Sequence, residues 1–355
     1  MRTAAILPAV LGVLLLGTLA GCCELARHGD RLVVTLVTDT SGVGDKGFNE
    51  VCWRGLQRAR RELGVVVKKI ESSDPANYVK NLSIAARYSD LTVANGFLLL
   101  DAMSDVAARY PESRFIFIDG EIRGRPNVAS YVFRAEEVGF LAGVLAAGMS
   151  RTRQVGVLKG MNIPTVEVFD FGYRAGVLCA DATWGTSTEV KALTVGSFND
   201  PRRGNSMTRQ LINDGCDVVF QLAGATGLGA LTAVRDGREG IYLIGVDLDQ
   251  DDEAPGRVLT SALKRIDAVV FDAVEELQEG RFRGGHNSIG LAEGALSFTD
   301  MRHTRHLIPE EVHRAVGFAR RLVIEGSVNL PQSYAALGDF EPVALRERGR
   351  EGGER

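Results

Sequence analysis

Three aspartates and one phenylalanine stand where stretches typical of buried strands come to an end. Asp39, Asp119 and Asp247 each close an apolar, β-branched run, and Phe198 follows another such run just before a helix start. Each alone has an ordinary structural explanation, as a helix cap, a turn former, a loop carboxylate or a core aromatic. Their shared position at corresponding strand ends is less easily accidental. Together they indicate a binding site.

Two glycine-containing loops accompany these residues. One loop follows the first aspartate and brings Asp45, Phe48 and Asn49 to the start of a predicted helix. The other contains Gly224 and Gly227 and lies between a strand and a helix, but its glycine spacing does not match the Gly-x-Gly-x-x-Gly pattern of dinucleotide sites. We therefore interpret it as a tight turn that lets backbone approach a neutral ligand or a facing lobe.

Signatures of common catalytic sites are missing from the sequence. It contains no Gly-x-x-x-x-Gly-Lys phosphate loop, no Gly-x-Ser-x-Gly elbow and no His-Glu-x-x-His zinc helix. His303, His306 and His313 are close in sequence, but no cysteine or suitably spaced carboxylate joins them, so a solvated loop is favoured over a metal site. We expect no catalytic residue, no metal and no cofactor.

The elements that must position these residues alternate between strand and helix from residue 31 onward, which is typical of parallel α/β layers. Hydrophobic patterns predict strands at 32–38, 65–70, 91–94, 115–118, 128–132, 154–158, 190–195, 217–222, 242–246 and 258–263. They predict helices at 47–63, 77–88, 99–109, 136–149, 166–180, 201–214, 227–235, 268–279 and 309–325. The two successive series predict two doubly wound parallel-sheet lobes joined by a hinge.

The length of the chain supports two lobes, because its roughly 330 residues after the leader exceed what one hydrophobic core usually serves. We assign 32–132 with about 264–295 to an N-terminal lobe, 133–263 with about 300–340 to a C-terminal lobe, and 341–355 to a disordered tail. Ligands of open parallel sheets bind at the carboxyl ends of the strands. The strand-end residues should therefore face a cleft between the lobes.

The amino-terminal segment reads as a bacterial lipoprotein signal. Arg2 precedes an apolar run, and Leu19-Ala20-Gly21 leads directly to Cys22. The run is too short and too interrupted for a membrane-spanning helix. We expect residues 1–21 to be removed, Cys22 to carry lipid, and residues 22–31 to tether a protein that faces the periplasm or the exterior of the cell.

Composition excludes some partners. The chain is 45% hydrophobic and 24% charged, and its net charge of -4 comes without a basic block, so nucleic acid is not an expected partner. Cys52, Cys179 and Cys216 each lie in apolar, periodic surroundings, which favours buried free thiols over a disulfide framework.

Several motifs in combination resemble the basic membrane protein family, whose members are lipoprotein receptors that feed ABC importers. The first is Thr38-Asp-Thr-Ser-Gly-Val-Gly-Asp-Lys-Gly-Phe-Asn49 with Trp53. The others are Phe117-Ile-Asp119, Gly139-Phe-Leu-Ala-Gly143, Gly196-Ser-Phe-Asn-Asp200, Ala223-Gly-Ala-Thr-Gly227, Ile244-Gly-Val-Asp-Leu-Asp-Gln250 and Leu259-Thr-Ser-Ala-Leu-Lys264. The resemblance implies a type I periplasmic-binding fold, a purine nucleoside as ligand and an ABC permease in the membrane as partner.

The resemblance also implies roles for individual residues. Phe48 and Phe198 would stack on a flat base from opposite lobes, and such stacking stabilises by about 1 to 3 kcal/mol per face. Asp247 and Lys264 would bind the sugar hydroxyls. The polar edges of the base would be bound by side chains of the first lobe, namely Asp39, Asn49 and Asp119.

The chain departs from the family pattern at Gly47, at Ala225 and in the segment that ends at Phe169. Phe169 and Gly224 are therefore possible additional ligand contacts, and an alternative ligand is a flavin such as riboflavin, whose ribityl chain offers hydroxyls. An alternative of another class is a nucleoside hydrolase that uses Asp39 and Asp45 on calcium. The glycine-rich flanks of Asp45 favour a ligand-contact loop over that enzyme.

Overall fold

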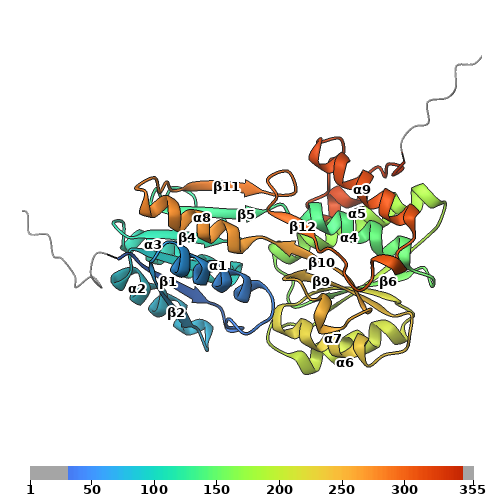
Figure 1. Cartoon of the computed structure of the whole chain (residues 1–355), viewed down its shortest axis with the longest axis horizontal. Helices are drawn as coiled ribbons and strands as arrows, with labels where there is room; N and C mark the ends of the chain where they lie inside the picture. Colours follow the sequence, from blue (N-terminus) through green and yellow to red (C-terminus); the bar gives the residue numbers. More distant parts are fainter. Residues whose placement is uncertain (1–30, 347–355) are drawn as a thin grey trace, which may run out of the picture.

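The structure, a computed structural model, describes residues 31–346 and has two lobes side by side along its longest axis (Figure 1). The predicted signal peptide, Cys22 and most of the tether lie outside the described residues. Within the described part of the chain, no helix is both long enough and apolar enough to cross a membrane.

The N-terminal lobe is built on a six-stranded parallel sheet with the strand order β11-β5-β4-β3-β1-β2. Its inner strands consist almost entirely of buried residues, as expected when helices cover both faces of a sheet. The strands are β1 (Val33–Thr38), β2 (Val66–Glu71), β3 (Leu91–Asn95), β4 (Arg114–Ile118), β5 (Val128–Phe133) and β11 (Gly285–Ile289).

The C-terminal lobe repeats this plan with the strand order β12-β10-β9-β8-β6-β7. All of its strand pairs are parallel except β10 with β12, which are antiparallel. The strands are β6 (Gln154–Lys159), β7 (Glu189–Thr194), β8 (Val218–Leu222), β9 (Tyr242–Asp247), β10 (Val258–Lys264) and β12 (Leu296–Phe298). The predicted class of two doubly wound parallel-sheet lobes is confirmed.

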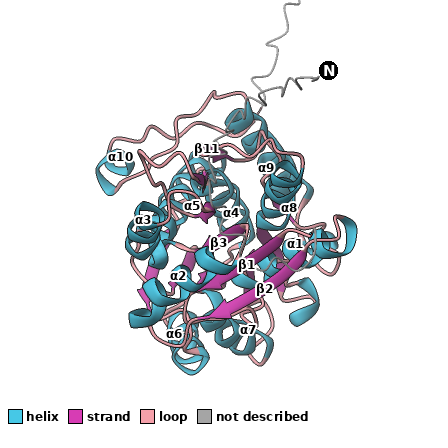
Figure 2. Ribbon diagram, turned by 90° about the vertical axis from the view of Figure 1, so that its left-hand side faces the viewer, coloured by secondary structure: helices cyan, strands magenta, loops and turns pink. Residues whose placement is uncertain are grey.

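Helices cover both faces of each sheet, as Figure 2 shows for the N-terminal lobe. In that lobe α1 (Phe48–Glu62) and α8 (Ile266–Gln278) pack on one face, and α2 (Tyr78–Tyr88) and α3 (Leu100–Arg109) pack on the other. In the C-terminal lobe α4 (Ala135–Met149), α5 (Pro164–Trp184) and α9 (Glu310–Ile324) oppose α6 (Pro201–Asn213) and α7 (Gly227–Arg235). A short helix, α10 (Tyr334–Gly338), contacts α5.

The chain crosses between the lobes at three places. The first crossing joins β5 to α4, the second joins β10 to α8, and the third joins β11 to β12. Phe133 ends β5 and Lys264 ends β10, so both residues lie where the backbone passes from one lobe to the other. Several crossings of this kind define a hinge axis about which two lobes can close.

Helices α4 and α5 pack with their backbones in close contact. A Cβ at Gly143 would come within 1.9 Å of the Tyr173 carbonyl oxygen, and one at Gly176 would come within 2.1 Å of the Phe140 carbonyl oxygen. Each position therefore requires glycine, because no side-chain movement can relieve a clash with backbone. The two glycines of the Gly139–Gly143 motif, which carries part of the family resemblance, are therefore packing residues of this helix pair.

Replacing Gly143 with alanine should lower the free energy of unfolding by about 1 to 3 kcal/mol or more, the usual cost of overpacking. The control is Gly317→Ala in α9, where an added Cβ meets no atom within 4 Å. Because alanine is the better helix former, that change should be neutral or stabilise by up to about 1 kcal/mol. Denaturant unfolding of both variants measures the difference, and equal stabilities would contradict the close packing.

Some predictions from the sequence need correction. Strands β11 and β12 were not predicted, because neither has a long apolar or alternating pattern. The tail was expected to be disordered from residue 341, yet the backbone N–H of Val343 donates to Cys179 Sγ and Leu345 is buried. Residues 347–355 lie outside the described part. The prediction of buried free thiols at Cys52, Cys179 and Cys216 is confirmed.

Candidate functional site

A cavity lies between the carboxyl ends of the two sheets. It holds about 610 Å³ of space, part of it open to solvent. Every ligand-contact residue proposed from the sequence lines it, which brings together residues from seven separate stretches of the chain. These residues are Asp39, Phe48, Asn49, Asp119, Phe169, Phe198, Gly224, Asp247 and Lys264.

Phe48 and Phe198 enter this cavity from opposite lobes. Phe48 is the first residue of α1, and Phe198 lies in the loop between β7 and α6. Each ring packs against a glycine, since a Cβ at Gly96 would lie 3.3 Å from Phe48 and one at Gly160 would lie 2.3 Å from Phe198. Both rings remain partly exposed. An aromatic surface is therefore available on both sides of the cavity.

Asp39 and Asn49 form a buried polar chain with Asn95. The Asn49 amide donates to Asp39 Oδ1 at 2.9 Å, and the Asn95 amide donates to Asn49 Oδ1 at 2.9 Å. The backbone N–H of Ser41 also donates to Asp39 Oδ1 at 3.0 Å. Burial raises the pKa of Asp39 despite these donors. Because the amide oxygen and one N–H of Asn49 are already used, its main role is to position Asp39.

Asp45 caps the start of α1. Its carboxylate accepts from the backbone N–H groups of Gly47, Asn49 and Glu50, at 2.9 to 3.0 Å. Burial raises the pKa of Asp45 to about 6, and these donors oppose the rise. Such a carboxylate is held by the helix N-terminus. The arrangement does not favour the calcium-binding role considered for Asp39 and Asp45.

Lys264 is the cationic centre of the cavity. Its ammonium lies 2.6 Å from Asp119 Oδ2, and it is almost completely buried. The same ammonium stands 5.2, 5.1 and 5.3 Å from the ring centres of Phe48, Phe133 and Phe169. Rings at such distances attract a cation through their electron-rich faces. One residue therefore links the N-terminal lobe, the hinge and α5.

Asp119 and Asp247 occupy equivalent places, each next to the carboxyl end of the fourth strand in its lobe. Both have a positive φ, of 63° for Asp119 and 66° for Asp247, which aspartate tolerates better than most residues. The Lys264 ammonium pairs with Asp119 across the lobes. The resemblance implies that Asp119 binds a base and Lys264 binds a sugar. In the structure these two side chains already contact each other.

Asp247, by contrast, has no described hydrogen-bond donor on its carboxylate, although it is buried at the cavity wall. Burial raises its pKa to about 7, the nearby Lys264 opposes this rise, and Asp119 and Asp45 add to it. A buried carboxylate that lacks donors is costly unless a ligand or water supplies them. Asp247 is therefore a carboxylate of the cavity wall that no described donor satisfies.

Sequence reasoning missed several residues of the cavity wall. Gly96, Phe97 and Leu98 follow β3, and Thr165 and its neighbours open α5. The signal for the first group was available, because strand β3 was predicted and its carboxyl end lies at the cleft. Phe133 had no local signal, since only its contact with Lys264 gives it a place at the site. The remaining residues missed are Ser41, Ile163, Val166, Leu222, Ala223 and Val246.

Direct contacts bridge the two lobes beside the cavity. The amide of Asn199 donates to the Thr40 carbonyl oxygen at 3.2 Å, and the amide of Gln250 donates to that of Lys46 at 3.2 Å. The Lys46 ammonium also lies 2.6 Å from Glu253 in a surface ion pair. The loop that follows Asp247 thus meets the loop that precedes Phe48.

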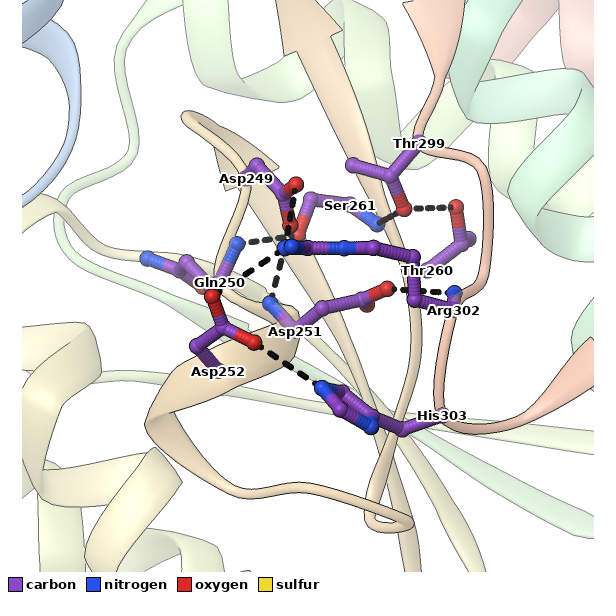
Figure 3. A network of polar contacts seen from close by, with 9 residues as sticks. All are labelled: Asp249, Gln250, Asp251, Asp252, Thr260, Ser261, Thr299, Arg302 and His303. Atoms are coloured by element: carbon purple, nitrogen blue, oxygen red, sulfur yellow. Dashed lines mark hydrogen bonds and ion pairs between the residues drawn. The ribbon is translucent and has the colours of Figure 1, made fainter.

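A polar network holds that loop of the C-terminal lobe in place (Figure 3). Arg302 bonds to Asp249 at 3.1 Å and to Asp252 at 3.2 Å through its side chain, and its backbone N–H donates to Asp251. His303 Nε2 lies 2.9 Å from Asp252. The segment after β12 therefore supports the loop that touches the other lobe.

The C-terminal histidines do not converge. The ring of His303 pairs with Asp252, whereas the ring of His313 bonds to the backbone carbonyl of Arg305. Among residues 31–346, no group of three or more histidine, cysteine, aspartate or glutamate side chains is arranged to hold a metal ion. His303 and His313 thus serve separate local contacts.

Comparison with known proteins gives consistent results. Residues 32–325 match the sequence model of a family described as PnrA-like ABC transporter substrate-binding proteins. The chain is 31% identical to an uncharacterized lipoprotein of Pyrococcus horikoshii, over 82% of this chain and 76% of that protein. It is 29% identical to the ABC transporter nucleoside-binding protein BmpA of Lactococcus lactis, over 93% of this chain and 99% of that protein.

Solved structures agree with the fold. A solute-binding protein of an ABC transporter system from Aeropyrum pernix superposes with a TM-score of 0.80 at 31% identity, covering 87% of this chain and 96% of the other. A solute-binding protein from Conexibacter woesei superposes with a TM-score of 0.67 at 21% identity, which speaks for the fold alone. At 31% identity, the first of these two structures also indicates relationship and not only a shared fold.

Proposed function

The chain belongs to the family of PnrA-like ABC transporter substrate-binding proteins, and on this premise we propose that it binds a purine nucleoside between its lobes and delivers it to an ABC permease. Binding and delivery require no chemical transformation of the ligand. The observation that carries the proposal is the presence, in one cavity, of two phenylalanines from opposite lobes and of the Asp247 carboxylate, which accepts from no donor among residues 31–346.

The chemistry of the cavity divides into two halves. Phe48 and Phe198 offer ring faces on which a flat base can stack, whereas Asp247 and Lys264 offer an acceptor and a donor for vicinal hydroxyls. Asp39, held by Asn49, presents its second oxygen to ring nitrogen or amino donors. A nucleoside combines these two halves in one molecule. The name of the Lactococcus relative, a nucleoside-binding protein, supports this choice.

Lipid attachment at Cys22 completes the proposal. The sequence around Cys22 has the features of a lipoprotein signal, and the Pyrococcus relative is named a lipoprotein. The protein would then be held at the outer side of the cytoplasmic membrane, beside its permease. Mass spectrometry of the protein extracted from membranes tests this directly, and an amino terminus without lipid would contradict it.

Titration calorimetry with inosine, guanosine, adenosine and riboflavin tests the ligand. Micromolar or tighter binding of a purine nucleoside is the expected result. Binding of riboflavin alone would mean that the ligand is a flavin and not a nucleoside, and the purified protein would then be yellow. Release of free base on prolonged incubation would instead support a hydrolase. No binding of any of the four at millimolar ligand would contradict the proposed function.

The pH dependence of affinity offers a sharper prediction, because hydroxyl donors favour the ionised form of Asp247. Its pKa is about 7, so below pH 7 binding must release a proton. Affinity should therefore fall by up to about tenfold per pH unit as the pH drops from 7 towards 5.5. Calorimetry in buffers of different ionisation enthalpy measures the proton released.

The control for this pH dependence is Asp247→Asn, whose affinity should be weaker and nearly independent of pH in that range, apart from the smaller influence of Asp45 and Asp39. The stability of the ligand-free protein should change with pH in the opposite direction to the affinity. A raised carboxyl pKa stabilises the folded state at low pH, and this contribution is lost as the pH rises from about 4 through 7. An affinity that is constant with pH in the unmodified protein would show that Asp247 does not accept from the ligand.

A further inference from the structure

The outer end of the N-terminal lobe, opposite the cleft, carries a concentration of arginines. All six strands of this lobe run in parallel, so their starting residues and the ends of the preceding helices lie at one edge of the sheet. Figure 2 looks at the molecule from this side. The exposed arginines of this edge, here called the basic pole, are Arg31, Arg60, Arg61, Arg87, Arg109, Arg114, Arg125, Arg281 and Arg283.

Most of this charge is not neutralised within the lobe. Arg109 pairs with Asp105, and Arg281 pairs with Glu279. No described carboxylate lies within ion-pairing distance of Arg60, Arg61 or Arg114. Of the other exposed carboxylates at this edge, Glu62 pairs with Arg58, and Glu112 has no described ion-pair partner. The basic pole is therefore a cationic surface on a chain whose net charge is -4.

The corresponding end of the C-terminal lobe provides an internal comparison, because it is built from the same arrangement of strand starts and helix ends. There basic and acidic residues alternate, and Arg235 is paired with Asp236. The exposed charged residues of that end include Arg151, Glu189, Arg209, Asp214, Arg235, Asp236, Arg238 and Glu239. A shared fold therefore does not explain the excess of arginine at the other end.

The basic pole lies close in sequence to the predicted lipid site, which indicates the membrane surface as its partner. Arg31 belongs to the pole and directly precedes β1, and Cys22 is only nine residues before it. Even fully extended, that length of chain reaches about 30 Å. A lipid on Cys22 would hold the basic pole within this distance of the membrane surface. A basic surface beside the anchor adds a second, electrostatic attraction to anionic lipid.

We propose that the basic pole rests on anionic phospholipid headgroups. The lipid-anchored protein would then stand on its N-terminal lobe, with the long axis of its two lobes pointing out from the membrane surface. This inference depends on the lipid anchor of the proposed function, but not on the identity of the ligand. Attraction between arginines and headgroups is electrostatic, so it weakens as salt is added. The protein would leave this resting orientation when its cleft meets the permease.

Hydrogen exchange of the full chain, purified with its lipid and inserted into vesicles, tests the proposal. We compare vesicles that mix phosphatidylglycerol with phosphatidylcholine and vesicles of pure phosphatidylcholine. In the mixed vesicles, amides of residues 60–65 and 109–114 should exchange more slowly, by a factor of about three. Amides of residues 235–240, at the opposite end, should be unaffected. Raising the salt to about 1 M, where the Debye length falls to about 3 Å, should abolish the protection.

Two matched double variants separate the surface from the anchor. Arg60→Glu with Arg61→Glu should remove the protection, whereas Arg235→Glu with Arg238→Glu should leave it unchanged. A lipidated protein whose basic pole exchanges equally fast in both kinds of vesicle would overturn this inference and leave the proposed function intact. Absence of lipid at Cys22 would overturn both this inference and the anchoring. Protection that appears only when the permease is present would mean a protein surface instead of lipid, and would also overturn it.

Discussion

Replacing Lys264 with methionine should destabilise the protein by about 3 to 5 kcal/mol and abolish measurable ligand binding. The change removes the partner of Asp119 and the nearest cation to Asp247, and leaves two buried carboxylates without compensation. Methionine nearly preserves the length and apolar stem of lysine, so lost packing contributes little. The loss in unfolding free energy should be smaller at pH 5 than at pH 8, because burial raises the pKa of Asp247 to about 7, so that at pH 5 this carboxyl group is protonated and needs no cation.

The structure offers a matched control in Lys46→Met. Lys46 also pairs with a carboxylate of the other lobe, but its side chain is 50% exposed and that of Glu253 is 38% exposed. Exposed pairs of this kind contribute about 0 to 1 kcal/mol. Urea unfolding at two pH values compares the variants. Equal and small effects of the two substitutions would show that the Lys264 pair is as well solvated as the surface pair.

Phe48→Ala and Phe198→Ala should each weaken ligand binding by about 5-fold to 150-fold, which corresponds to the 1 to 3 kcal/mol that one stacked face contributes. The free energy of unfolding should fall much less than for a core phenylalanine, since both rings are partly exposed at the cavity wall. Phe48→Leu should recover part of the stability and little of the affinity, because leucine fills space without a flat face.

The control for the rings is Phe318→Ala, which removes a partly buried ring of α9 that does not line the cavity. Its affinity should equal that of the unmodified protein. The double variant of Phe48 and Phe198 should lose close to the sum of the two single effects if each ring contacts a separate face of the ligand. A loss from only one of the two variants would mean that the ligand stacks on one lobe alone.

Predictions from local pattern succeeded for most elements, for a reason that the lobes make clear. The inner strands are buried on both faces, so they read as continuous apolar runs, and the helices between them have one apolar face. The edge strands β11 and β12 have no such pattern, whereas the edge strands β2 and β7 were predicted. In β11, a sequence of glycine, histidine, asparagine and serine precedes its single isoleucine, and only its pairing with β5 makes it a strand.

The sequence by itself determined the two α/β series and the strand ends at which Asp39, Asp119 and Asp247 stand, because periods of burial and the rule of carboxyl ends are local properties of the chain. Only the tertiary structure decided which side chains contact each other at those strand ends. It turned Asn49 towards Asp39, paired Lys264 with Asp119 across the hinge, and left Asp247 without a donor in the part of the chain that the structure describes. These contacts join residues far apart in sequence, and their geometry depends on how three crossings orient two separately folded sheets.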